Sequence, residues 1–241
     1  MNGKRLQPPF DNAMSRNRQL LGWIYLPLHM VALPLLLPVF GAVSPTPLSG
    51  GQINLIYYGL SLLVVLAVML PFLRRNFDNM VDQPLRCVMC MFGAVLADYA
   101  MTMLSALVLL LLMPDFEANP NNEATMAMAA QDYGVIKALT IFIEPLVEEV
   151  LYRGVAFGSI RSRSRGWAYG VSILLFALSH VWQPLLVTGD LRMLIYCIQY
   201  VPVAIVTAWL YESSGTIWTS VFFHMGYNAV SFAALQMLEQ L

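Results

Sequence analysis

Seven long apolar runs limit what this chain can fold into more than any other feature of its sequence. A helix needs roughly 20 apolar residues to cross a bilayer, and each run has, or nearly has, that length. The composition agrees, because 59% of the residues are hydrophobic, 11% are charged and the mean hydropathy is +0.65, whereas soluble domains carry about a quarter charged residues. We therefore predict an all-α, polytopic membrane helix bundle with about seven transmembrane helices. The runs lie near 20–43, 53–73, 87–113, 134–157, 167–187, 193–211 and 216–237.

Lysine and arginine fall at alternate ends of these predicted spans. They precede the first (Lys4, Arg5, Arg16, Arg18), separate the second from the third (Arg74, Arg75, Arg86) and separate the fourth from the fifth (Arg161, Arg163, Arg165). The segments 44–52 and 114–133 contain none, and the second is acidic, with Asp115, Glu117, Glu123 and Asp132. Short loops rich in Lys and Arg stay in the cytoplasm. We therefore expect a cytoplasmic N-terminus, an external C-terminus and a multi-pass protein of the cell (plasma or inner) membrane.

Several other features narrow the class of protein. The net charge of −1 leaves no basic surface for nucleic acid, so the expected partners are the bilayer and a substrate within it. The first apolar run exceeds the roughly 7 to 15 residues of a signal-peptide core, which predicts a retained span. The cysteines Cys87, Cys90 and Cys197 include one Cys-x-x-Cys pair, but it opens an apolar helix and nothing pairs with it at zinc-site spacing. We interpret them as reduced thiols.

Three carboxylates and a guanidinium interrupt the fourth run, in the segment 144–154. Charge inside a span costs roughly 2.5 to 3.5 kcal/mol per group unless it is paired or lines a wet cavity. Glu149 and Arg153 are four residues apart and form a favourable helix pair, whereas Glu148 points about 100° away, on the side of Glu144. An acid held apart from the arginine can act as a general base. The alternative is a buried ion pair that only fixes helix packing.

Two of the three histidines lie within apolar helices, where a polar side chain needs a partner. His180 is in the fifth run, and His224 shares a helix face with Asn228 in the seventh. Counted from the cytoplasmic end of each span, these residues and Glu148 lie roughly 12 to 20 Å deep. A single buried histidine is more often a packing residue than a catalyst. Carboxylates, two imidazoles and an amide at one depth suit hydrolysis of an amide by water.

At these residues the chain resembles the CPBP intramembrane proteases, which include the CAAX prenyl endopeptidases and bacteriocin-processing or immunity-type proteins. The resemblance rests on three motifs in order: Glu148-Glu149-x-x-x-Arg153-Gly154, Phe176-x-x-x-His180, and His224-x-x-x-Asn228 after Ser214-Gly215-Thr216-Ile217-Trp218. It covers about 134 to 237. We accordingly divide one integral membrane domain into 1–133, with three membrane helices and an acidic external loop, and 134–241, the protease core.

The resemblance implies a role for each matching residue. Glu148 would activate the attacking water together with His180, while His224 and Asn228 would stabilise the oxyanion. Glu149 would belong to the catalytic set with Arg153 in support. Glu144 departs from the family pattern, in which a small or apolar residue more often precedes the proline. It would either act on Glu148 or mark a side pocket.

A metal is a second possibility at the same residues. Glu148, His180 and His224 would complete a zinc site with water as the fourth ligand, and the family is often labelled metalloprotease. A His-x-x-x-Asn helix is not the His-Glu-x-x-His arrangement that puts two imidazoles on one helix face. We favour a glutamate-activated water with no obligatory cofactor and keep zinc as the alternative.

The leading hypothesis is therefore an endopeptidase acting on a peptide or membrane-anchored protein. A non-proteolytic membrane immunity or regulatory partner is the main alternative, and a proton-coupled transporter is the third, because intramembrane Glu and His also form proton relays. The sequence selects neither a substrate, prenylated or not, nor an oligomeric state. Asp98 in the third run either lines the same cavity or bonds neighbouring hydroxyls. For His29 we expect a packing or interfacial role.

Overall fold

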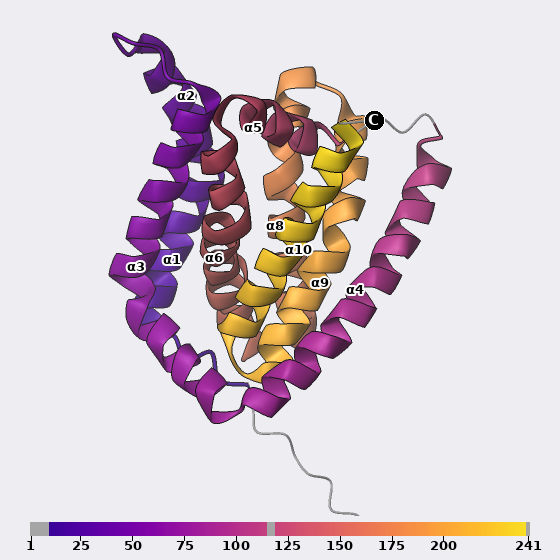
Figure 1. Ribbon diagram of the computed structural model, residues 1–241. Coiled ribbons are helices and arrows are strands. Elements are labelled where there is room, and N and C mark those ends of the chain that lie inside the picture. The colour runs from indigo at the N-terminus through magenta and orange to yellow at the C-terminus, as the bar shows by residue number, and fades with distance from the viewer. Residues whose placement is uncertain (1–9, 115–118, 240–241) are drawn as a thin grey trace, which may run out of the picture.

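The computed structural model describes residues 10–114 and 119–239, and within them every regular element is a helix (Figure 1). The elements are α1 (Arg16–Pro27), η1 (Leu28–Ala32), α2 (Leu33–Val43), α3 (Gly50–Asp82), α4 (Pro84–Leu112), α5 (Pro120–Ala138), η2 (Leu139–Ile143), α6 (Glu144–Glu148), η3 (Glu149–Phe157), α7 (Gly158–Arg161), α8 (Arg165–Thr188), η4 (Leu191–Tyr196), α9 (Cys197–Ser214) and α10 (Ile217–Glu239). The predicted all-α membrane bundle is confirmed. Lys4, Arg5, Asp115 and Glu117 lie outside the described residues.

Five helical stretches are long and apolar enough to cross a membrane: 16–43, 50–82, 84–112, 165–188 and 191–214. They coincide with the first, second, third, fifth and sixth predicted spans. The other two predicted spans correspond to the helical run 120–161, which is kinked at Asp132, and to α10. The polar residues of both lower their hydropathy. The chain is thus a multi-pass membrane protein, while seven crossings and the orientation stay predictions.

The first span is irregular where its prolines predict a kink. Pro27 ends α1, and the π-helical turn η1 follows before α2 begins. A proline removes one backbone donor, and neighbouring helices can satisfy the groups that it frees. His29 in this turn is buried and bonds α3, with Nδ1 3.0 Å from the Ser61 hydroxyl and Nε2 3.1 Å from the Tyr57 hydroxyl. The polar partners of His29 therefore lie on the next span, and the residue packs between the two helices.

The segment expected as an external loop is largely helical. Within the described residues, α5 begins at Pro120, and the Asn119 side chain caps it by accepting from the Asn121 amide at 2.9 Å. Proline suits the first helical position because its missing donor has no helical partner there. The alanine-rich stretch after it favours helix. Residues 126–130 are part of this helix, which crosses the end of the bundle (Figure 1).

Close packing places the polar helical run in the centre of the bundle. All nine residues of η3 are buried. A Cβ on Gly154 would lie 3.1 Å from the Phe72 ring and 3.2 Å from the Met14 methyl group. The absence of a side chain at Gly154 thus lets α3 and the N-terminal segment approach η3 closely. This contact fixes the depth and rotation of the helix that carries Glu148, Glu149 and Arg153.

Candidate active site

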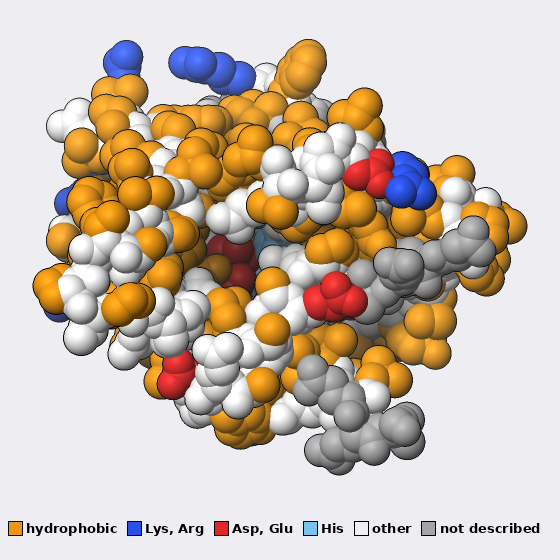
Figure 2. Space-filling model, turned by 90° about the horizontal axis from the view of Figure 1, so that it is seen from above, with side chains coloured by type: hydrophobic (Ala, Val, Ile, Leu, Met, Phe, Trp, Pro, Cys, Tyr) orange, Lys and Arg blue, Asp and Glu red, His pale blue; other side chains and the backbone are white. Residues whose placement is uncertain are grey.

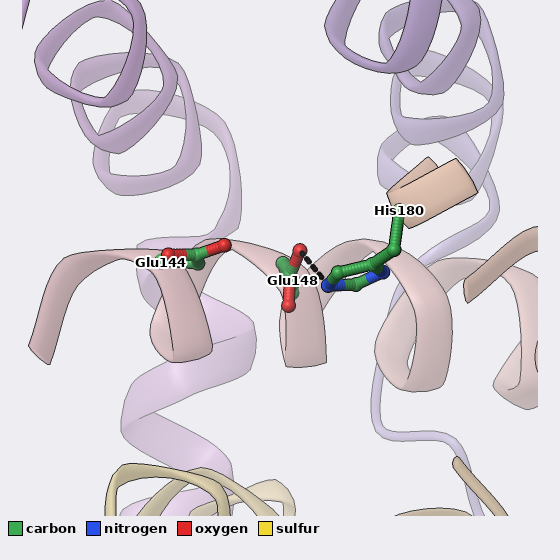
Figure 3. A group of neighbouring side chains, drawn as sticks. All are labelled: Glu144, Glu148 and His180. Atoms are coloured by element: carbon green, nitrogen blue, oxygen red, sulfur yellow. Dashed lines mark ion pairs between the residues drawn. The ribbon is translucent and has the colours of Figure 1, made fainter. Parts of the chain in front are cut away.

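The three acidic residues of the fourth predicted span lie on a helix that is partly π-helical. The α-helical turn α6 is flanked by the π-helical segments η2 and η3, and such segments are frequent at functional sites. Glu144 and Glu148 are one turn apart and point to the same side, toward His180 of α8 (Figure 3). We call Glu144, Glu148 and His180 the open cluster. One ligand atom from each lies within 4.8 Å of the others.

Glu149 and Arg153 point to the other side and pair as predicted. Glu149 Oε1 lies 3.0 Å from Arg153 Nη1, and both side chains are fully buried. The same carboxylate oxygen accepts from His224 Nδ1 of α10 at 2.9 Å. We call these three residues the paired cluster. Burying a guanidinium and a carboxylate is tolerated because each compensates the charge of the other.

Further contacts hold the guanidinium of Arg153 in place. Arg153 Nη2 donates to the Ala204 carbonyl at 3.3 Å, and its guanidinium lies 4.4 Å from the Phe176 ring centroid. The paired cluster thereby joins η3 to α9, α8 and α10. One oxygen of Glu149 (Oε2) and the Nε of Arg153 have no hydrogen-bond partner among the described residues. The pairing therefore uses one carboxylate oxygen and one edge of the guanidinium.

Two interactions orient His180 toward Glu148. Its Nδ1 lies 2.8 Å from the Phe176 carbonyl, and its ring stacks on Tyr200 with the centroids 4.3 Å apart. A carbonyl only accepts, so Nδ1 carries the hydrogen. In the neutral ring Nε2 is therefore an acceptor, and it faces Glu148 Oε1 at 3.7 Å.

His224 presents the same nitrogen to Glu148. Its Nε2 lies 3.9 Å from Glu148 Oε2, while its Nδ1 donates to Glu149. Glu148 therefore lies between two imidazoles whose other nitrogens are already engaged. Its Oε2 is buried and has no hydrogen-bond partner among the described residues. A buried carboxylate oxygen without a partner indicates a place for water, substrate or a cation.

The turn between α9 and α10 sets the position of His224. Gly215 has φ +78°, a conformation that glycine adopts without strain. The Ile217 amide donates to Asn76 Oδ1 at 2.9 Å, the Thr216 hydroxyl to the Asn76 carbonyl at 2.6 Å, and the Trp218 indole to the Leu73 carbonyl at 3.0 Å. The Ser-Gly-Thr-Ile-Trp flank of the third motif therefore anchors α10 to α3.

Asn228 is one helical turn beyond His224 and points toward the fourth predicted span. Its Nδ2 donates to the Thr140 carbonyl at 2.8 Å. An amide nitrogen carries two hydrogens, so one remains for another acceptor. All the predicted site residues thus come together, from η3, α6, α8 and α10.

Two cavities reach these residues. The α3 cavity, of about 430 Å³, lies between the first span, α3, α5, α6 and α8, and Glu148 lines it. The α4 cavity, of about 270 Å³, lies between α4, α5, α9 and α10 and contains His224 and Asn228 in its wall. Figure 2 shows a hollow with acidic and histidine side chains at its base, seen from the end where α5 lies.

Asp98 and the three cysteines line neither of the two cavities. Asp98 is buried on α4, and its Oδ1 has no hydrogen-bond partner among the described residues. Cys87, Cys90 and Cys197 are free thiols. Sequence reasoning missed the tyrosines of the α3 cavity, Tyr57, Tyr58 and Tyr152. Their types and spacing are ordinary for membrane helices, so no signal in the sequence marks them.

The donor set is compatible with a metal ion. Glu148 offers a carboxylate, and His180 and His224 offer Nε2 atoms whose other ring nitrogens donate to a carbonyl and a carboxylate. Ligating histidines usually have such second partners. Among the described residues, the group of three whose donor atoms lie within 4.8 Å of one another is Glu144, Glu148 and His180. The residues present therefore fit zinc chemically.

Comparison with protein families identifies the region that contains these residues. Residues 132–230 match the family described as type II CAAX prenyl endopeptidase Rce1-like. The match contains all three motifs and confirms the resemblance predicted from them. Comparison with curated proteins and with solved structures gave no match.

Proposed function

Since residues 132–230 match the family of Rce1-like CAAX prenyl endopeptidases, we propose that this protein is an intramembrane endopeptidase. It hydrolyses a peptide bond of a membrane-associated protein or peptide, in the cell (plasma or inner) membrane. The observation that carries the proposal is the place of Glu148, which lines a cavity and lies between two imidazole Nε2 atoms, with one carboxylate oxygen that has no hydrogen-bond partner among the described residues.

Glu148 acts as the general base. A water molecule beside Glu148 and His180 donates one hydrogen to Glu148 Oε1 and the other to His180 Nε2, which leaves its lone pair directed at the substrate. Glu148 takes the proton as the water oxygen attacks the carbonyl carbon. It then gives this proton to the leaving amine as the C–N bond breaks. His180 needs its hydrogen on Nδ1 for this role, and the Phe176 carbonyl holds it there.

His224 and Asn228 stabilise the negative oxygen of the tetrahedral intermediate. The Glu149 carboxylate accepts the Nδ1 hydrogen of His224, so the ring donates from Nε2 only when both nitrogens are protonated. The Glu149 carboxylate orients the ring through this bond, and Arg153 holds Glu149 in place. Asn228 donates the amide hydrogen that Thr140 does not use. Glu149 and Arg153 are thus positioning residues.

We favour this mechanism without an obligatory metal. If zinc binds, Glu148, His180 and His224 would hold it, and the ion would supply Lewis-acid activation of water. Cleavage by membranes treated exhaustively with chelators supports the metal-free proposal. Loss of cleavage that added zinc restores would overturn it.

The test compares peptide termini in membranes from cells that make the wild type, Glu148→Ala, His180→Ala or Asp78→Asn. Asp78 is an exposed carboxylate outside the cavities, so its variant is the matched control. We expect new termini with the wild type and Asp78→Asn and none with the other two. Unchanged cleavage in both site variants would rule the proposal out.

The alternative function is a non-proteolytic immunity or regulatory partner whose polar residues only hold the helices together. Glu148→Gln separates the two, because the amide keeps the shape and hydrogen bonding of the side chain but cannot accept the proton. A phenotype that survives Glu148→Gln favours the partner protein. A phenotype lost together with cleavage favours the protease.

A further inference from the structure

The α3 and α4 cavities approach the site from opposite sides of α5 and share part of their walls. Thr125, Glu144 and His180 line both. Glu148 lines only the α3 cavity, whereas His224 and Asn228 line only the α4 cavity. The proposed base and the proposed oxyanion groups therefore line different cavities, which adjoin at the residues they share. A carbonyl in contact with both sets lies where the cavities meet.

The helix α5 is fastened at its start and at the kink that it has at Asp132. The Asn119 amide donates to the Tyr200 hydroxyl at 2.9 Å, and the Ser49 hydroxyl donates to Asp132 Oδ2 at 3.0 Å. Between these anchors, α5 crosses the end of the bundle (Figure 1). A substrate that fills both cavities has to pass beneath it.

The walls of both cavities contain groups that suit a peptide backbone. Asn54 and Gln183 line the α3 cavity, and Thr102 lines the α4 cavity. The Thr102 hydroxyl is buried and has no hydrogen-bond partner among the described residues. It is thus free to bind a substrate carbonyl or amide. An extended chain advances about 3.3 Å per residue, so each cavity holds a short segment.

We propose that the substrate binds as an extended segment beneath α5, with the scissile carbonyl beside His180 and the chain continuing into both cavities. This rests on the proposed function and specifies its substrate class as chains with several residues on each side of the cleaved bond. A peptidase that removes a terminal residue needs only one cavity.

Blocking each cavity after folding tests the proposal. Single cysteines replace Ala124, in the wall of the α3 cavity, and Ser105, in the wall of the α4 cavity, in a chain whose native cysteines are replaced by alanine. Matched controls are Ala127→Cys on α5 and Leu107→Cys on α4, exposed positions that line neither cavity. Benzyl methanethiosulfonate modifies the folded proteins, and a reductant reverses the modification.

Modification at either cavity position is expected to slow cleavage about tenfold or more, because a displaced substrate loses its alignment. The reductant should restore the rate, and the controls should keep theirs. Full activity after complete modification of one cavity position would overturn the proposal. Absence of cleavage by the unmodified chain and by the wild type would instead contradict the proposed function.

The distribution of arginines supports a second inference independently. Arg18 Nε donates to the Val68 carbonyl at 3.0 Å, Arg86 Nε to the Ser213 carbonyl at 2.7 Å, and Arg165 Nη2 lies 3.0 Å from Glu212. These contacts join the start of α1, the second half of α3, the start of α4 and the end of α9 at one end of the bundle. The described arginines at this end are Arg16, Arg18, Arg74, Arg75, Arg86, Arg161, Arg163 and Arg165.

Both cavities open at the opposite end. Gly50 at the start of α3, Asn121 at the start of α5 and Gln183 near the end of α8 line the α3 cavity, and Leu235 near the end of α10 lines the α4 cavity. The view onto this end shows the hollow (Figure 2). Arginine-rich ends lie in the cytoplasm. We infer that the site is reached from the non-cytoplasmic side and that the substrate is a segment exposed there.

Labelling in sealed right-side-out vesicles tests from which side of the membrane the site is reached. A membrane-impermeant maleimide should label Ala124→Cys at once and Ser162→Cys, at the exposed α7–α8 turn, only after permeabilisation. The same reagent, added outside, should block cleavage by the Ala124→Cys chain. The reverse labelling order would overturn the inference and leave the proposed proteolysis standing.

Discussion

The open and paired clusters occupy opposite sides of one short helical stretch and differ in what surrounds their carboxylates. Glu149 is held by Arg153 and His224 at 3.0 and 2.9 Å, with no exposed surface. Glu148, the preceding residue, faces a cavity. Its nearest imidazole nitrogens are 3.7 and 3.9 Å away, and one of its oxygens has no hydrogen-bond partner among the described residues. Adjacent identical side chains therefore have different surroundings, and the proposed base is the one without built-in partners.

Removing the guanidinium should have the largest effect on the fold. Arg153→Met leaves the Glu149 carboxylate buried without its countercharge, and breaking a buried pair costs about 3–5 kcal/mol. The free energy of unfolding, or the melting temperature in detergent, measures this loss. The double variant Glu149→Gln/Arg153→Met should recover most of it. A double variant as unstable as Arg153→Met would show that the ion pair is not the source of the stability.

Asn228 should affect the rate rather than the stability. Removing one donor from an oxyanion site lowers kcat by about 10²–10³-fold, so Asn228→Ala should cleave that much more slowly. Asn228→Asp is an informative companion, because it keeps the size but loses the amide hydrogens. A wild-type kcat in both variants would contradict the oxyanion role.

Glu144 belongs to the open cluster but has no part in the proposed chemistry. Glu144→Gln should therefore remain within about tenfold of the wild-type rate, below the 10²–10⁴-fold that a general base contributes. Rates measured on one substrate at one pH decide this. A loss of rate as large as that of a Glu148 variant would show that both acids take part in the reaction. The two clusters would then not differ in the way proposed.

Chelation should have the smallest effect. The proposed base and its imidazole partners need no ion, so exhaustive treatment with a chelator should leave the cleavage rate unchanged. The sample is assayed before and after treatment and again after addition of zinc. If chelation lowers the cleavage rate and zinc restores it, Glu148, His180 and His224 would instead be ligands of a metal ion.

The sequence predicted what depends on local pattern. Apolar runs of about 20 residues fixed the spans because backbone groups must be satisfied inside lipid. The four-residue spacing predicted the pair of Glu149 with Arg153, and the three motifs predicted which helices meet. The confirmed match over 132–230 lies in this region.

Contacts between distant helices were not predictable in the same way. The bonds of His29 to Tyr57 and Ser61 depend on how the first span is rotated against α3. The stacking of His180 on Tyr200 depends on α9. Neither contact has a pattern within its own segment. The start of α5 was expected as part of a loop because its polar composition outweighed its cap.

The most direct test of the account is the rate of cleavage by Glu148→Gln, measured together with its melting temperature and beside Glu144→Gln. We predict a rate about 10²–10⁴-fold below the wild type for Glu148→Gln, as expected when a general base is lost, with a melting temperature no lower than that of the wild type. Cleavage by a folded Glu148→Gln protein at the rate of Glu144→Gln would contradict the claim that Glu148 activates the water.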